Sequence, residues 1–328
     1  MKMFKKTLAM LLALIMVLTL AACGAAQPAE TKAPTEAPTE ATAEATTEAP
    51  TEAPTAPAVT ELEYVGLPGS GIPGTADNLA PNFSYGVDLS FYNVNDTDYR
   101  DYITNDDSGA DYSLVDFEKM KADGCDFVIL RLGSEDASGR FFDPHFITYY
   151  NLAREAGMDI GLYYYTYSLT YEDAVADAEY VISVIEENDM YFEYPIFMDL
   201  EEDSQLNLPM EELSNVCVGW AQTLSDAGYF PAIYSSFFMY DNISASVKAN
   251  LDFWIAYIST EGAQANTRSK YNPDNTNISN EACMWQYDWH APDEFDGIGM
   301  DFLDVNVSYK DYPAIMAEHG YNNVITAE

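Results

Sequence analysis

Basic side chains are scarce in this sequence of 328 residues. Fourteen Lys and Arg stand against 54 Asp and Glu, which gives a formal net charge of -40. The first 63 residues hold eight of the acids and four of the bases, so they contribute -4, and the remaining -36 lies beyond them. A surface this acidic repels the phosphate backbone of nucleic acids. The composition therefore excludes DNA or RNA as a partner.

Cysteine and histidine are also rare, with four and three copies. Apart from Cys23, the cysteines are Cys125, Cys217 and Cys283, an odd number with apolar neighbours, which predicts buried free thiols. A bridge between one pair stays open at this point. No cysteines lie close enough to each other or to a histidine to suggest a zinc site, so neither a metal nor a cofactor is expected.

Long apolar runs are missing except at the N-terminus, where residues 7–20 follow three lysines. This run has the length of a signal peptide and is too short for a stable membrane span. It ends in Leu20-Ala21-Ala22-Cys23-Gly24, which resembles a bacterial lipobox. We expect residues 1–22 to be a lipoprotein signal peptide and Cys23 to be lipidated, placing the protein outside the cytoplasm on the cell membrane. An ordinary secretory signal with a chance cysteine is the alternative.

Large apolar residues are absent from the next stretch, where Ala-Pro-Thr-Glu repeats, as at residues 33–36 and 37–40. Such a chain cannot bury enough surface to offset the entropy of ordering. Residues 61–82, rich in Gly and Pro, are interpreted as the end of the same segment. The sequence therefore predicts a disordered linker over residues 23–82 and a folded domain over residues 83–328.

Beyond residue 83, apolar strand-like segments alternate with amphipathic helix-like ones. Strands are expected at 85–90, 127–132, 160–167, 195–201 and 230–235, helices at 113–123, 144–156, 170–187 and 209–226, and shorter β segments at 252–258, 282–287 and 301–307. Near-continuous apolar strands separated by helices predict a parallel sheet covered on its faces. A barrel or a doubly wound sheet would fit this order.

Two acids mark the end of the middle strand, in Phe197-Met198-Asp199-Leu200-Glu201. Residues two apart in a strand share a face, so Asp199 and Glu201 project together. Two carboxylates this close do not ionise independently, which suits acid/base chemistry. An acidic strand end that enters a solvated loop is the alternative.

Convergence favours the barrel, because the carboxyl ends of its parallel strands share one mouth. Asp88 ends the first strand and Asp304 lies in the last, so both are expected beside Asp199 and Glu201. Four carboxylates with aromatic rings suit a carbohydrate, although each ring could equally belong to the core. The aromatic residues expected to bind substrate are Tyr163, Tyr165, Tyr167, Trp254, Trp285 and Tyr287.

These motifs together resemble glycoside hydrolase family 25, the lysozymes that cut bacterial cell-wall glycan. The resemblance runs in order through roughly residues 85–310. Its segments are Gly86-Val87-Asp88-Leu89-Ser90, residues 127–131, Gly161-Leu162-Tyr163-Tyr164-Tyr165, residues 197–201, residues 228–236, Trp285-Gln286-Tyr287 and Asp304-Val305-Asn306.

The resemblance implies an α/β fold, a single-domain modified TIM-type barrel with about five βα units followed by three strands with few helices. It also implies N-acetylmuramidase activity on the β-1,4 bond between N-acetylmuramic acid and N-acetylglucosamine. By this comparison Glu201 is the general acid, and Asp88, Asp199 and Asp304 are the other acids of the site. On physical grounds Glu201, crowded by Asp199, holds its proton to higher pH while Asp199 stays charged. Whether the nucleophile is an acetamido group, a water or an enzyme carboxylate depends on the separation of the carboxylates.

Two segments depart from the family pattern. Asn93 and Val94 replace a Gln and Gly and precede an acidic insertion at 96–111, which is either a solvated loop or a Ca²⁺ site. Residues 254–258 lack the family's Gln and Tyr. A non-catalytic barrel that binds wall glycan is therefore the main alternative, followed by a chitinase-like barrel and a solute-binding lipoprotein.

Overall fold

The computed structural model describes residues 59–71, 84–93, 115–136, 138–257, 282–289, 295 and 303–325. The predicted signal peptide, the lipidation site Cys23, the linker up to residue 58 and the acidic insertion at 96–111 lie outside the described residues.

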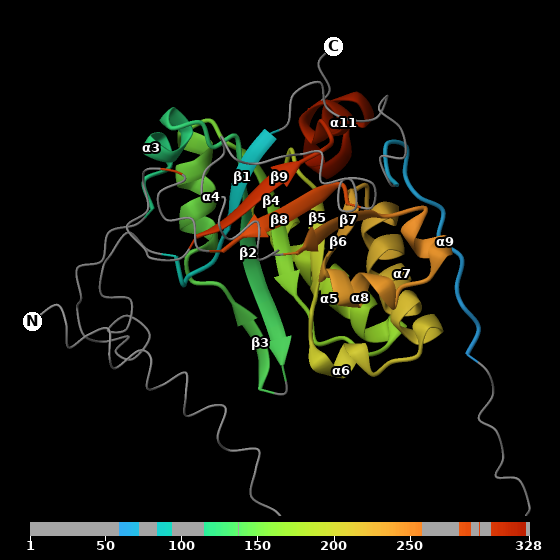
Figure 1. Cartoon of the computed structure of the whole chain (residues 1–328). Coiled ribbons are helices and arrows are strands. Elements are labelled where there is room, and N and C mark those ends of the chain that lie inside the picture. The colour runs from blue at the N-terminus through green and yellow to red at the C-terminus, as the bar shows by residue number, and fades with distance from the viewer. Residues whose placement is uncertain are drawn as a thin grey trace, which may run out of the picture. The chain divides into compact units, whose positions relative to one another are not determined.

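Eight strands in the described part of the chain close into a barrel (Figure 1). The ring closes because β1 pairs with β2 on one side and β9 on the other. The barrel strands are β1 (Ser84–Leu89), β2 (Phe127–Asp136), β4 (Asp159–Tyr165), β5 (Ile196–Leu200), β6 (Pro231–Ser236), β7 (Asp252–Ala256), β8 (Met284–Asp288) and β9 (Asp304–Ser308). A further strand, β3 (Gly139–Phe142), pairs with β2 as a hairpin that extends past the barrel. The predicted barrel is confirmed, and the doubly wound sheet is wrong.

The last barrel strand runs against its neighbours. All other barrel pairs are parallel, whereas β9 is antiparallel to both β1 and β8. Its first residue, Asp304, pairs in register with Asp88 of β1. The start of β9 therefore lies where the other strands end. Asp304 does reach the shared mouth as expected, although through a reversal of strand direction that the sequence did not predict.

Within the described ranges, helices follow β1, β2, β4, β5 and β6, as predicted, and only a single helix and a 3₁₀ turn follow β7. The helices are α3 (Phe117–Ala122), α4 (Phe146–Glu155), α5 (Tyr171–Glu187), α6 (Asp203–Leu206), α7 (Met210–Asp226), α8 (Phe237–Asp241), α9 (Ala245–Lys248) and α11 (Tyr312–His319), with a 3₁₀ turn, η4 (Tyr321–Asn323). Helix α5 begins with a capping box, since Thr170 and Asp173 each accept from the other's backbone N–H. None of the described helices is both long and apolar enough to cross a membrane.

Alternation along the strands separates two apolar layers. In β5, Phe197 packs inside the barrel, while Ile196, Met198 and Leu200 point outward to the layer under the helices. Burial on both faces explains why the sequence of this strand is continuously apolar. The cysteines Cys125, Cys217 and Cys283 are buried and free, as expected.

Residues 59–71, named here the N-terminal strap, pack along the outside of the barrel. Leu62 N–H donates to Asn215 of α7 at 2.7 Å, and Gly71 N–H donates to Asp252 of β7 at 2.6 Å. The side chain of Tyr64 is buried and bonds Ser225 at 2.8 Å. The linker predicted over 23–82 is therefore wrong for this stretch, because Tyr64 and the strap's backbone groups find partners that a local composition rule cannot foresee.

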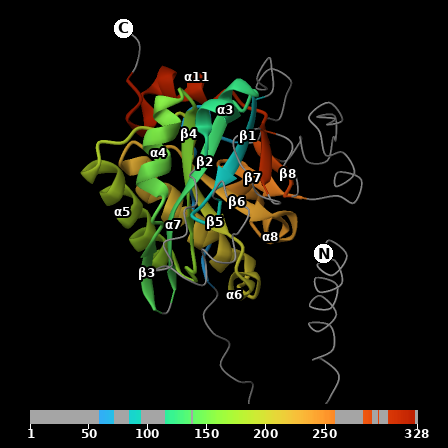
Figure 2. The same cartoon turned by 90° about the vertical axis from the view of Figure 1, so that its left-hand side faces the viewer.

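The two ends of the barrel carry different elements. The β2–β3 hairpin and α6 lie at one end and α11 at the other, in both views (Figures 1 and 2). Because α6 begins two residues after Glu201, the end with α6 is the one where β5 delivers its acids.

Candidate active site

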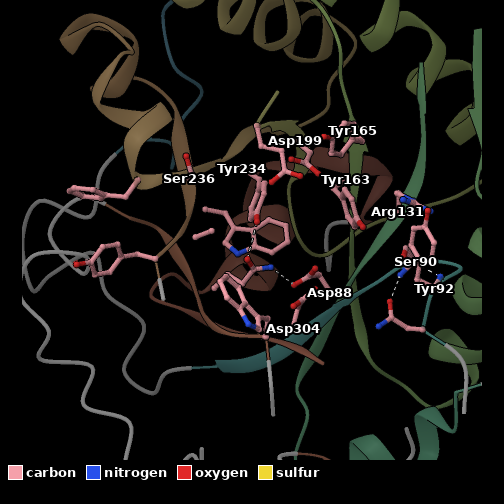
Figure 3. A pocket seen from close by; sticks show the side chains of 18 of the residues that line it. Asp88, Ser90, Tyr92, Arg131, Tyr163, Tyr165, Asp199, Tyr234, Ser236 and Asp304 are labelled. Atoms are coloured by element: carbon pink, nitrogen blue, oxygen red, sulfur yellow. Dashed lines mark hydrogen bonds between the residues drawn. The ribbon is translucent and has the colours of Figure 1, made fainter. Parts of the chain in front are cut away.

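A cleft of about 840 Å³ opens at the end of the barrel that carries α6. All four predicted acids, Asp88, Asp199, Glu201 and Asp304, line it. Figure 3 shows the side chains of Asp88, Asp199 and Asp304 directed into this one pocket. The structure thus brings together acids from strands β1, β5 and β9. The two that lie farthest apart in sequence, Asp88 and Asp304, are separated by more than two hundred residues.

Asp88 is held in place by two amides. Its Oδ1 accepts from Asn306 Nδ2 at 2.8 Å and from Gln286 Nε2 at 3.0 Å. The orientation of both amides is fixed from behind, because Trp254 Nε1 donates to Asn306 Oδ1 at 2.8 Å and Tyr234 hydroxyl donates to Gln286 Oε1 at 2.9 Å. An indole N–H can only donate, so the Asn306 amide must present its N–H to Asp88.

Burial raises the pKa values of Asp88 and Asp304. For Asp88 the pKa rises to about 6, although the bonds from Asn306 and Gln286 oppose the rise. For Asp304 burial and the negative charges of Asp88, Glu201 and Asp288 raise the pKa to about 8. A charge confined in a dry cleft is costly, so Asp304 retains its proton at neutral pH, whereas Asp88 releases its proton there.

Asp199 differs from its predicted state. Asp199 is 4% exposed, and its buried Oδ1 has no hydrogen-bond partner among the described residues. Burial, followed by the charges of Glu201 and Asp88, raises the pKa of Asp199 well above its ordinary value. The prediction that the pKa of Asp199 stays low while that of Glu201 rises is therefore wrong. Strand β5 places Asp199 inside the barrel, where loss of solvent is the largest cause of its raised pKa.

Glu201 lies just beyond the end of β5 and is open to the solvent of the cleft. The surrounding cleft walls raise its pKa, and the charges of Asp88 and Glu202 add to the shift. The raised pKa of Glu201 agrees in direction with the prediction. The carboxyl of Glu201 is thus both protonated to higher pH and accessible to a ligand.

The predicted aromatic residues do not all lie in the same part of the barrel. Tyr163 and Tyr165 line the cleft, whereas Tyr167 lines a separate hollow of about 220 Å³. Trp254 also borders the cleft but is 1% exposed, so its ring supports Asn306 and offers no open stacking face.

Trp285 and Tyr287 are not among the described residues that line the cleft, and their role in substrate binding stays a prediction. Both side chains belong to the layer under the helices. Gln286 between them points inward to Asp88. Side chains alternate along a strand, so a triplet can present either its centre or its flanks to the cleft, and here it presents its centre.

Several lining residues were missed at the sequence level. Gln286 and Asn306 belong to two of the family motifs, next to aromatic and acidic residues. A neutral amide side chain carries no charge and no periodic signal that would mark it as a site residue. The rim contains the exposed aromatic side chains of Tyr92, Phe238, Tyr257 and Trp289. Arg131 of β2 also lines the cleft.

The chemistry that the cleft can support follows from these groups. Within the described residues, no cluster of three or more His, Cys, Asp or Glu side chains is arranged to hold a metal ion. The cleft offers an accessible proton donor in Glu201 and an oriented carboxyl in Asp88. Cleavage of a glycosidic bond requires a proton for the leaving oxygen and negative charge near an oxocarbenium-like centre.

Comparison with known proteins agrees with this chemistry. The sequence profile of Glycosyl hydrolases family 25 matches residues 108–294, more than half of the chain. No match is found among curated proteins. The fold is similar to the spore cortex lytic enzyme SleM of Clostridium perfringens, with a TM-score of 0.52, 20% identity, and coverage of 70% of this chain and 68% of that one.

Two further solved structures share the fold. A bacterial lysozyme from Streptomyces coelicolor has a TM-score of 0.50 and 16% identity over 76% of this chain and 100% of that one. The glycosyl hydrolase 25 GHIP of Streptococcus pneumoniae has a TM-score of 0.51 and 13% identity over 72% and 92%. The profile match and the acid-lined barrel mouth together establish that this chain belongs to glycosyl hydrolases family 25 and is a glycoside hydrolase.

Proposed function

We propose that the protein is a peptidoglycan hydrolase, an N-acetylmuramidase that cleaves the β-1,4 bond between N-acetylmuramic acid and N-acetylglucosamine. The convergence of Asp88, Asp199, Glu201 and Asp304 in one cleft is the observation that carries this proposal. The names of two structures with the same fold, a spore cortex lytic enzyme and a bacterial lysozyme, support it. Peptidoglycan glycan strands are the proposed partner.

In this proposal Glu201 is the general acid that protonates the leaving glycosidic oxygen. Its raised pKa favours the protonated form, and its exposure gives the substrate access. Asp88, Asp199 and Asp304 surround the anomeric centre, where a carboxylate stabilises developing positive charge. Asp88 is best suited to carry that charge, because two amides donate to its Oδ1.

Replacing Glu201 by Gln tests the assignment. The variant keeps the shape of the side chain and removes its proton, so the release of reducing sugar from purified peptidoglycan is expected to fall about 10²- to 10⁴-fold. Glu211→Gln, an exposed acid of α7 outside the cleft, is the matched control and should remain active. Full activity of Glu201→Gln would remove this residue from the role. Binding of glycan by the wild-type protein without any cleavage would instead favour the non-catalytic alternative.

We further propose that Cys23 is lipidated and anchors the protein on the outer face of the cell membrane. The apolar run at 7–20 and the Leu-Ala-Ala-Cys sequence support this proposal. Incorporation of labelled fatty acid in a bacterial host measures it, and Cys23→Ser should abolish the label. A labelled Cys23→Ser protein would show that the anchor, if any, lies elsewhere.

A further inference from the structure

Arg131 of β2 enters the cleft with its guanidinium rigidly held. The group lies over three aromatic rings, 4.9 Å from the centroid of Phe91, 5.1 Å from Tyr92 and 5.6 Å from Phe141. Its Nε donates to Asp143 Oδ2 at 2.9 Å. A guanidinium sandwiched between rings and tied at one nitrogen has little freedom left, so its remaining N–H groups point in fixed directions.

One of those directions is unused. The Nη2 atom of Arg131 is buried, and none of the described residues forms a hydrogen bond with it. Asp143 cannot readily serve it, since Asp143 Oδ2 already accepts from Phe91 N–H at 3.0 Å besides Arg131, and Oδ1 accepts from His145 N–H at 2.9 Å. A buried charged donor without a partner is expensive, which indicates a site that a ligand completes.

The charge of Arg131 is unusual for its surroundings. Among the described residues that line the cleft it is the one cation, beside four acids. Arg131 forms its ion pair with Asp143, which is not among the described residues that line the cleft. The four acids of the cleft therefore do not occupy the guanidinium group of Arg131. In a protein of net charge -40, an anionic group of a substrate needs a local positive charge in order to enter.

We propose that Arg131 Nη2 binds a carboxylate of the substrate and makes Arg131 a specificity-determining residue. This inference rests on the proposed muramidase function, because muramic acid carries a lactyl carboxyl and the stem peptide attached to it carries carboxylates of its own. Glycans built only from N-acetylglucosamine have no such group. Arg131 therefore selects wall glycan over chitin-like polymers by a charge-assisted hydrogen bond.

The test measures binding by the full chain, using ligands without the bond that a muramidase cuts. The disaccharide with N-acetylglucosamine linked β-1,4 to N-acetylmuramic acid is compared as the free lactyl acid, as the neutral lactyl amide, and with a stem peptide bearing free carboxylates. A charge-assisted bond predicts that a carboxylated ligand binds the wild type about 10-fold more tightly than the lactyl amide. The free acid and the peptide form distinguish the two sources of the carboxylate.

Arg131→Gln should lose this preference, and Arg131→Lys, which keeps the charge without the planar fork, should retain part of it. Arg140→Gln is the control, because Arg140 pairs with Glu135 on the neighbouring hairpin and does not line the cleft. A merely structural role of Arg131 would weaken binding of all three ligands equally in Arg131→Gln.

The wild-type comparison decides the matter even if a variant folds poorly. Equal affinity of the wild type for acid, amide and peptide forms, while peptidoglycan is still cleaved, would overturn the carboxylate site and leave the proposed function intact. A wild-type protein that neither binds any of the three ligands nor cleaves peptidoglycan would overturn both proposals.

Discussion

The pKa of Asp304 is raised further than that of Asp88. Asp304 stands opposite Asp88 in the β1–β9 register, and burial and neighbouring charges raise its pKa to about 8. In the unfolded chain an Asp titrates near about 3.9. Between these two pH values the folded protein keeps a proton that the unfolded protein releases.

This difference makes the fold less stable as pH rises. The stabilising contribution is complete below the unfolded pKa and is lost as pH passes through the folded pKa. Asp304→Asn removes the titrating group while keeping the shape of the side chain. We expect its free energy of unfolding to exceed that of the wild type by several kcal/mol at pH 8, at about 1.4 kcal/mol per unit of pKa difference, and to differ little at pH 4.

Urea unfolding at the two pH values measures the effect. Glu179→Gln, an exposed acid of α5, serves as the control and should leave the pH dependence unchanged. An equal change at pH 4 and pH 8 in Asp304→Asn would show that the acid does not titrate differently in the two states. Because Asp304 lines the cleft, a gain in stability at neutral pH would also show that the acid cluster is maintained at the expense of the fold.

At the scale of elements, a buried ion pair joins the N-terminal strap to β7 and to the chain after β9. Lys310 Nζ lies 2.7 Å from Asp252 Oδ2, and both side chains are almost fully buried. The same Nζ donates to the carbonyl oxygens of Gly69 and Gly71, and Tyr312 hydroxyl donates to Asp252 Oδ2 at 2.8 Å. One cation thus connects the strap, β7 and the chain that follows β9.

Lys310→Met should destabilise the protein by about 3 kcal/mol, because it leaves Asp252 charged and buried without its cation. Hydrogen exchange at Gly71, whose N–H donates to Asp252, should accelerate as the strap loosens. Thermal unfolding and hydrogen exchange measure the two effects. Lys119→Met is the control, because its pair with Asp116 is exposed and spans 3.8 Å, and it should cost less than about 1 kcal/mol. A loss as small in Lys310→Met would contradict the connecting role.

At the scale of the whole molecule, the protein carries a net charge of -40 and also gathers four of its acids in one cleft. The pKa values of these four acids are raised. Gathering like charges is unfavourable unless protons are retained, which is the condition that general acid catalysis needs. The long-range arrangement therefore supports the same chemistry as the local geometry of Glu201.

Much of this arrangement was predictable. Near-continuous apolar runs alternating with helical patterns indicated the five βα units. The pairing of Asp199 with Glu201 on one face also followed from strand geometry. The faces of Trp285 and Tyr287 were not predictable, because a strand buried on both sides has no polar face to distinguish its inside from its outside.

The sequence by itself determined which residues form each element and which of them share a face, since these depend on neighbours a few positions away. Only the tertiary structure decided the reversed direction of β9, the attachment of Gly71 to Asp252 across 181 positions, and the vacant donor of Arg131. These features depend on pairing between distant segments and on desolvation inside the barrel. Neither leaves a periodic signal in the chain, because both arise from partners that the fold alone brings together.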